Sequence, residues 1–134
     1  MSESDRIRLL HMLDAAKEAL AFASGRERTH LESNRMLALA LIKEVEIIGE
    51  AATRVSRELA DANPQIPWAK VAGMRNNRLI HAYFDIDFDI LWETVVTAVP
   101  ALATETTGII RVIYLRPSPA PERFNKKASQ TLTN

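Results

Sequence analysis

Apolar residues recur every three or four positions along most of this chain, the spacing that places side chains on one face of an α-helix. The first such stretch covers residues 7–23 and is followed by Ser24-Gly25, a plausible stop signal. The second runs from residue 37 to residue 59, about six helical turns, and ends before Asn63-Pro64. We therefore expect one helix over residues 7–23 and a single long helix over residues 37–59.

Two more helices are expected in the second half of the chain. Pro67 suits a first helical turn, and the apolar residues from Trp68 onward predict a short helix that carries or ends at the polar residues after it. Apolar positions over residues 90–113 predict a last helix, with a kink at Pro100 because proline has no amide hydrogen to donate. Gly108 is a second weak point.

These patterns predict an all-α protein, an antiparallel bundle of four to five helices, because no alternating apolar and polar run is long enough for a sheet. The length of 134 residues allows one domain, which we assign to residues 1–115. Residues 116–134 are rich in proline and basic residues and are expected to form a flexible tail. The helices carry more apolar residues than one core-facing stripe needs, so we expect a homodimer.

Composition excludes several classes of function. The chain contains no cysteine, so thiol chemistry, disulfides and cysteine-ligated metals are absent, which fits a cytoplasmic protein. The charged amino terminus lacks the apolar core of a signal peptide, and the longest uncharged run is too short to span a bilayer. Lysine plus arginine and aspartate plus glutamate each number 17. Residues 111–134 hold five basic residues and one acidic residue, which leaves 12 against 16 in residues 1–110, so any basic site in the body must be local.

The stretch "GMRNNRLIHAY" at residues 73–83 concentrates the polar chemistry of the chain. Arg75 is a permanent cation, His81 can exchange a proton near neutral pH, and Tyr83 carries a phenolic hydroxyl. In RNA cleavage without a metal, a histidine can move the proton of the 2′-hydroxyl while an arginine stabilises the charged transition state. The alternative is a surface cation and a hydrogen-bonded structural imidazole, which composition alone favours.

The stretches "MRNNRLIHAYF" and "DIDFDILWETV" closely resemble the HepT-like toxins of the HEPN superfamily of helical ribonucleases. The segments "IKEVEIIGEAATRVS", "NPQIPWAKVAGMRN" and "LWETVVTAVPAL" are also similar to that family, so the resemblance covers roughly residues 5–113. It implies a homodimeric HEPN-like bundle that cuts RNA without metal or cofactor. The motif residues are Arg75 and His81 as the catalytic pair, Asn76 in support, and Tyr83; Arg78 is a candidate for binding RNA phosphate.

The spacing within this motif leaves two arrangements open. Five residues separate Arg75 from His81, one more than in many relatives. On one continuous helix the two side chains would lie about 120° apart around the axis and about 9 Å apart along it, too far to touch. Either the helix breaks near Asn76-Asn77, or the site is composite, with motifs of two subunits facing each other, as the resemblance implies.

The resemblance also implies a partner and a mode of control. In this family an MntA-like nucleotidyltransferase antitoxin attaches AMP to the motif tyrosine, here Tyr83, and silences the toxin. The added bulk and negative charge beside Arg75 and His81 would exclude an RNA phosphate. The competing interpretation is a tyrosine that packs its ring and bonds its hydroxyl.

Residues outside the motif supply further expectations. Glycine is costly inside a helix, by about 1 kcal/mol relative to alanine, so Gly49 suggests close approach of another backbone. The family-like "IGEA" suggests that Glu50 pairs with Arg75 in support of the site, with a solvated or intrahelical role as the alternative. The acids of "DIDFD" are expected to cap the last helix rather than to bind a metal. His11 and His30 are expected to be structural or surface residues.

The rival hypothesis is a helical dimer that binds nucleotide, RNA or the nucleotidyltransferase partner without catalysis. A third interpretation is a purely structural dimerisation domain.

Overall fold

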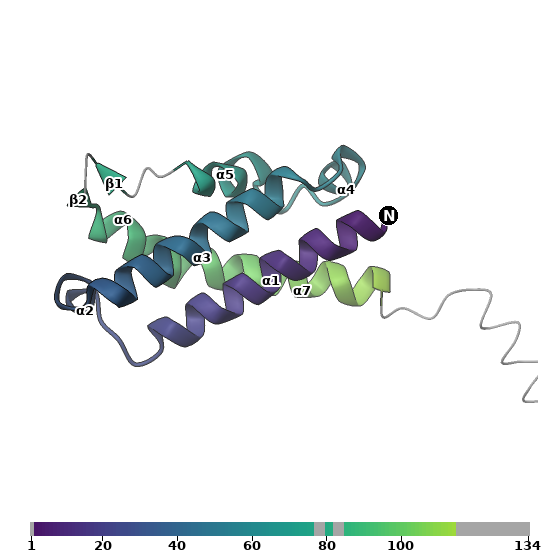
Figure 1. The fold of residues 1–134 in the computed structure, drawn as a ribbon. Coiled ribbons are helices and arrows are strands. Elements are labelled where there is room, and N and C mark those ends of the chain that lie inside the picture. Colours follow the sequence, from purple (N-terminus) through teal and green to yellow (C-terminus); the bar gives the residue numbers. More distant parts are fainter. Residues whose placement is uncertain (1, 77–79, 82–84, 115–134) are drawn as a thin grey trace, which may run out of the picture.

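The computed structural model describes residues 2–76, 80–81 and 85–114, which form a helical bundle (Figure 1). The expected all-α class is confirmed; residues 116–134, the expected tail, lie outside the described part of the chain. The helices are α1 Glu3–Ala23, α2 Thr29–Ser33, α3 Arg35–Thr53, α4 Arg57–Ala62, α5 Trp68–Ala72, α6 Phe88–Glu93 and α7 Val99–Tyr114. A 3₁₀ turn, η1, covers Gly73–Arg75, a π-helical turn, η2, covers Thr94–Ala98, and two short strands are β1 Ile80–His81 and β2 Asp85–Ile86.

The core lies between α1, α3 and the helical run that ends in α7. Helices α1 and α3 cross the front of the bundle antiparallel to each other, and α7 lies behind them (Figure 1). Gly25, with φ of +72°, ends the first helical region where a stop was expected. The large side chains that are fully enclosed here come from all three helical segments and include Leu9, Met12, Leu41, Val45, Ile48, Leu91, Val95 and Val99.

Residues 88–114 form one helical run through α6, η2 and α7, interrupted by the π-helical turn just before Pro100. In η2 the Val99 amide donates to the carbonyl of Thr94, five residues back. The irregularity expected at Pro100 is therefore present, as a π-helical turn, while α7 continues through Gly108 without a break. By length and composition residues 88–113 would suffice to cross a membrane, but their buried positions form one stripe, Leu91, Val95, Val99, Leu102, Thr106 and Ile109, that faces the core.

The prediction of one long helix over residues 37–59 is wrong. Helix α3 ends at Thr53, and α4 starts at Arg57 after a break. Ser56 causes the break, because its Oγ accepts a hydrogen bond from the Leu59 amide as the N-cap of α4. Its own amide and hydroxyl donate to the buried carboxylate of Asp5, at 2.8 and 2.6 Å. Burial raises the pKa of Asp5, but the hydrogen bonds from Ser56 and Ser2 outweigh it and lower the pKa overall.

The remaining local elements include two that the sequence did not predict. Helix α2 was not predicted, and neither was the small antiparallel ladder that pairs Ile80 with Ile86 and His81 with Asp85. The helix entering the polar stretch ends with η1 at Arg75, so a continuous helix from Arg75 to His81 is excluded. The expected capping of the last helix is confirmed, since Asp87 Oδ1 accepts from the Ile90 amide at 3.0 Å.

Candidate functional site

Gly49 of α3 allows the backbone that carries Arg75 to lie directly against the helix. A Cβ placed on Gly49 would overlap the amide nitrogen of Arg75 and lie 3.0 Å from the carbonyl carbon of Met74. Both are backbone atoms, which cannot move aside without shifting η1. The close approach expected at Gly49 is confirmed, and its partner is the turn that ends at Arg75.

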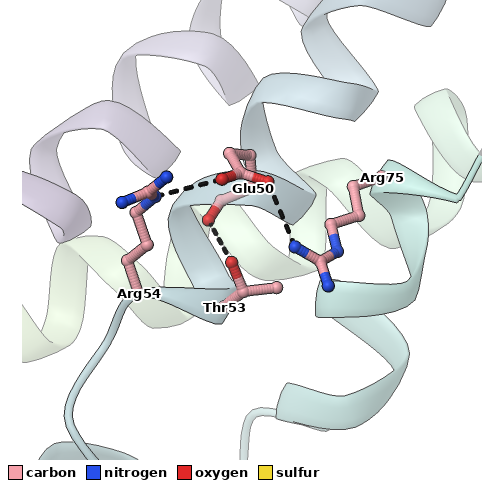
Figure 2. Close-up of polar contacts among 4 residues, drawn as sticks. All are labelled: Glu50, Thr53, Arg54 and Arg75. Atoms are coloured by element: carbon pink, nitrogen blue, oxygen red, sulfur yellow. Dashed lines mark hydrogen bonds and ion pairs between the residues drawn. The ribbon is translucent and has the colours of Figure 1, made fainter.

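Glu50, the next residue, holds the Arg75 side chain from the same helix. Figure 2 shows its carboxylate between two guanidinium groups, with Oε2 3.3 Å from Nη1 of Arg75 and Oε1 3.0 Å from Nε of Arg54. These hydrogen bonds, first that from Arg54 and then that from Arg75, lower the pKa of Glu50. The Glu50–Arg75 ion pair expected from the sequence is therefore present. Arg75 remains about half exposed, at 48%, so its guanidinium is accessible to a ligand.

Arg75 lies at the rim of a groove between α1 and α3, which we call the basic groove. Its volume is about 340 Å³, and its lining side chains come from α1, α3 and η1. The charged and ionisable side chains that line it are Arg8, His11, Lys43, Glu46, Glu50, Arg54 and Arg75. Four permanent cations face two carboxylates, so the groove is a local basic site on a body whose residues 1–110 are acidic overall.

A second hollow, which we call the acidic hollow, continues from the basic groove along the same two helices. It shares His11 and Ile47 with the groove, has a volume of about 200 Å³, and is lined further by Asp14, Glu18 and Glu44. Glu44 is 6% exposed. Its burial, together with a hydrogen bond to Glu18 and the charge of Glu18, raises the pKa of Glu44 to about 7.

The other motif residues are placed less completely. Asn76 is exposed and follows η1, and its backbone amide donates a hydrogen bond to the Gly73 carbonyl at 3.0 Å. The backbone of His81 lies in β1 opposite Asp85. Arg78 and Tyr83 lie outside the described residues, so their predicted roles stay predictions. Arg75 and Glu50 are the predicted site residues whose side chains the structure brings together.

Sequence reasoning missed the basic lining residues Arg8, Lys43 and Arg54. Lys43 of α3 and Arg54, the residue that caps the end of α3, lie eleven residues apart, about three helical turns, and so lie on the same side of the helix as Glu50. That signal was available, but nothing in the sequence indicated that this face meets Arg8 and His11 of α1. The structural interpretation of His30 is confirmed, since its Nδ1 accepts from the Glu27 amide at 2.8 Å.

Comparison with known proteins assigns the sequence to a family. The sequence pattern of the family described as "Ribonuclease HepT-like" matches residues 12–109, a range that contains Glu50 and the whole motif from Arg75 to Tyr83. The chain belongs to the HepT-like ribonuclease family. The resemblance stated from the motif and its flanks is thereby confirmed.

Curated relatives of this HepT-like chain carry ribonuclease names. A protein named "Putative RNase" from Methanocaldococcus jannaschii is 34% identical over 97 residues, covering 72% of this chain and 88% of the relative. Another of the same description from Caldanaerobacter subterraneus is 30% identical and covers 77% of this chain and 91% of its own length. A "Probable ribonuclease HepT" from Thermococcus cleftensis is 44% identical over 63 residues, 47% of this chain and 56% of that protein. No solved structure matches the chain.

Proposed function

We propose that this HepT-like protein is the toxin of a toxin–antitoxin pair, an endoribonuclease that cuts RNA without a metal. The observation that carries the proposal is the presentation of Arg75. Gly49 and Glu50 together place a half-exposed guanidinium at the rim of a groove with a surplus of positive charge. Such an arrangement suits a phosphodiester, which is anionic before and during cleavage.

The chemical step needs one proton acceptor, one proton donor and one stabiliser of charge. The ribose 2′-oxygen attacks the adjacent phosphorus while His81 takes its proton, and the bond from phosphorus to the 5′-oxygen breaks. The leaving 5′-oxygen takes a proton from a water molecule, and the resulting hydroxide is neutralised by the proton that His81 then releases, so the products are a 2′,3′-cyclic phosphate and a 5′-hydroxyl. Arg75 stabilises the non-bridging oxygens, Asn76 orients the scissile group, and Arg78 holds a neighbouring phosphate. No electron or metal enters this balance.

A homodimer with a composite site accompanies this proposal. The helix break after Arg75, the first of the two arrangements that the spacing left open, is present. The composite site is proposed in addition, on the strength of the family resemblance. Large apolar side chains also remain exposed on the described surface; Met36 is 83% exposed, Val112 59% and Ile90 45%. We propose that a second copy covers part of this surface and that the same dimer sets two motifs against each other. Analytical ultracentrifugation that finds a monomer at micromolar concentration contradicts this part of the proposal.

Control is proposed to act through Tyr83. An MntA-like nucleotidyltransferase antitoxin transfers AMP from ATP to the Tyr83 hydroxyl and releases pyrophosphate. The attached phosphate is an anion that competes with RNA for the cations near it, so cleavage stops. Intact mass measurement of protein co-expressed with such a partner is expected to show one or more added adenylyl units, and Tyr83→Phe is expected to carry none at this position.

The decisive experiment is incubation of the purified protein with RNA in excess EDTA. Cleavage with 2′,3′-cyclic phosphate ends is expected for the parent, and a loss of about 10²–10⁴-fold is expected for His81→Ala. Circular dichroism of the variant controls for folding. Cleavage that requires added Mg²⁺, or that His81→Ala leaves intact, contradicts the assignment. Binding of RNA with no strand breakage by the parent favours the rival, a non-catalytic binding dimer.

A further inference from the structure

The basic groove extends well beyond Arg75, and two of its cations have no counter-ion within the described residues. Glu50 serves both Arg54 and Arg75. Arg8 and Lys43 form no ion pair in the described part of the chain. The Nε atom of Arg8 is also buried and finds no hydrogen-bond partner there. Unpaired cations that line a concavity are what a polyanionic ligand requires.

We propose that the basic groove binds the phosphates of a single RNA strand on one side of the linkage cut at Arg75, through Arg8, Lys43 and Arg54. This inference rests on the proposed ribonuclease function and extends it to the recognition of substrate. Lys43 and Arg54 lie about 16 Å apart along the axis of α3, so the groove accommodates several nucleotides rather than one phosphate. The contacts are to the backbone and therefore do not select sequence.

The ion pairs of Glu50 leave donors of both arginines free for RNA. In the free protein this carboxylate contacts both Arg54 and Arg75 (Figure 2) and neutralises part of their charge. All three side chains are about half exposed. An RNA phosphate can bind one further donor of each arginine while the pairs with Glu50 remain, because a guanidinium carries five N–H donors. Glu50 then keeps Arg75 oriented while the phosphate occupies the free donors.

The acidic hollow limits how far the strand extends. Asp14, Glu18 and Glu44 line it, and it adjoins the basic groove at His11 and Ile47. Carboxylates repel phosphates, so the bound segment ends near His11 and the strand leaves the surface there. The change from basic to acidic side chains along α1 and α3 thus limits the length of RNA that the groove binds.

The test measures binding apart from cleavage. Full-length protein is titrated with fluorescent single-stranded RNA in which every 2′-hydroxyl is methylated, so that the attacking group is absent, at several KCl concentrations. Arg8→Gln, Lys43→Gln and Arg54→Gln are each expected to weaken binding roughly 3–10-fold and to reduce the slope of log K against log salt by about 0.7, the value for one phosphate contact on a single strand. Arg26→Gln and Lys17→Gln are matched controls, exposed cations outside the groove with the same loss of charge, and should change neither quantity.

The outcomes separate this inference from the proposed function. If the groove variants bind with the affinity and salt slope of the controls, the groove is not the RNA path, even if the parent cuts RNA. If they lose binding although the parent never cuts RNA, the groove assignment stands and the ribonuclease proposal fails. If they retain RNA binding but lose association with the nucleotidyltransferase partner, the groove is a protein-docking surface and the inference is overturned.

Discussion

Two glutamates of α3, six residues apart, occupy opposite electrostatic environments. Glu50 is about half exposed and hydrogen-bonded to Arg54 and Arg75, which lower its pKa. Glu44 is buried beside Glu18, and burial raises its pKa to about 7. The same side chain on the same helix is therefore a fixed anion at one end of the α1–α3 interface and a titrating group at the other. What differs is which residues the neighbouring elements bring to each position.

The largest expected effect is at the Glu50 end, on catalysis. Arg75→Ala removes the group proposed to stabilise the transition state and should lower RNA cleavage about 10²–10³-fold. Folding should survive, because Arg75 is half exposed and its ion pair lies at the surface. Cleavage assays in EDTA measure the loss. Arg26→Ala removes an exposed arginine elsewhere and should cleave as the parent does; equal effects of the two changes contradict the role of Arg75.

The second largest effect is expected for Gly49, the glycine that allows η1 to pack against α3. Gly49→Ala gains about 1 kcal/mol of helix propensity but forces a Cβ into backbone atoms of Met74 and Arg75. The overlap outweighs the gain, so we expect a net loss of about 1–3 kcal/mol in the free energy of unfolding, together with reduced cleavage. Urea denaturation measures the first quantity.

Gly108→Ala is the matched control for that change. Gly108 is exposed in the interior of α7, and a Cβ there meets no atom within 4 Å. Only the propensity gain remains, so this variant should be more stable by about 0.5–1 kcal/mol. If Gly49→Ala and Gly108→Ala change the free energy of unfolding in the same direction, the packing role of Gly49 is contradicted.

The buried Glu44, beside Glu18, makes the stability of the fold depend on pH. The folded pKa of about 7 exceeds the ordinary value of 4.5, so between these values the folded state binds more protons than the unfolded state. The free energy of unfolding therefore falls as the pH rises through this window. Glu44→Gln removes the ionisation and should stabilise the protein at pH 8 by on the order of 1–2 kcal/mol, with the difference vanishing near pH 4.5.

Thermal unfolding of the parent and of Glu44→Gln from pH 4.5 to pH 8 checks this expectation. Glu105→Gln, an exposed glutamate of α7, provides the control and should leave the pH dependence unchanged. A Glu44→Gln curve parallel to that of the parent contradicts the buried-pair explanation.

The smallest expected effect on stability is that of Glu50→Gln. The amide keeps an acceptor oxygen for one arginine, and exposed ion pairs contribute little to folding. No resolved change in melting temperature is expected, while RNA affinity should increase because a negative charge leaves the basic groove. Weaker RNA binding by this variant indicates that orientation of Arg75 by the carboxylate matters more than its charge.

Some parts of the fold and site could be predicted from the chain alone. Helix α1, its stop at Gly25, the irregularity before Pro100 and the cap at Asp87 follow from local preferences, which act within one or two turns. The close approach at Gly49 was also predictable, because a glycine inside a long helix is costly and suggests that another backbone lies against it.

Other parts depended on contacts between distant residues. The apolar stripe continued past Thr53, but the helix breaks there because Ser56 caps a new helix, and Asp5, far away in sequence, holds Ser56 by accepting two hydrogen bonds from it. The basic groove was likewise invisible, because Arg8 and Lys43 share no sequence pattern and meet only where α1 packs on α3.

The sequence by itself determined the helical class, the family and the set of chemical groups in the motif, because these depend on residue types and their spacing. Only the tertiary structure decided that the Glu50–Arg75 pair lines a groove with Arg8 and Lys43 and that Glu44 is buried beside a second acid. Burial and charge pairing are properties of neighbours in space, and an antiparallel pair of helices creates those neighbours only once its register is set.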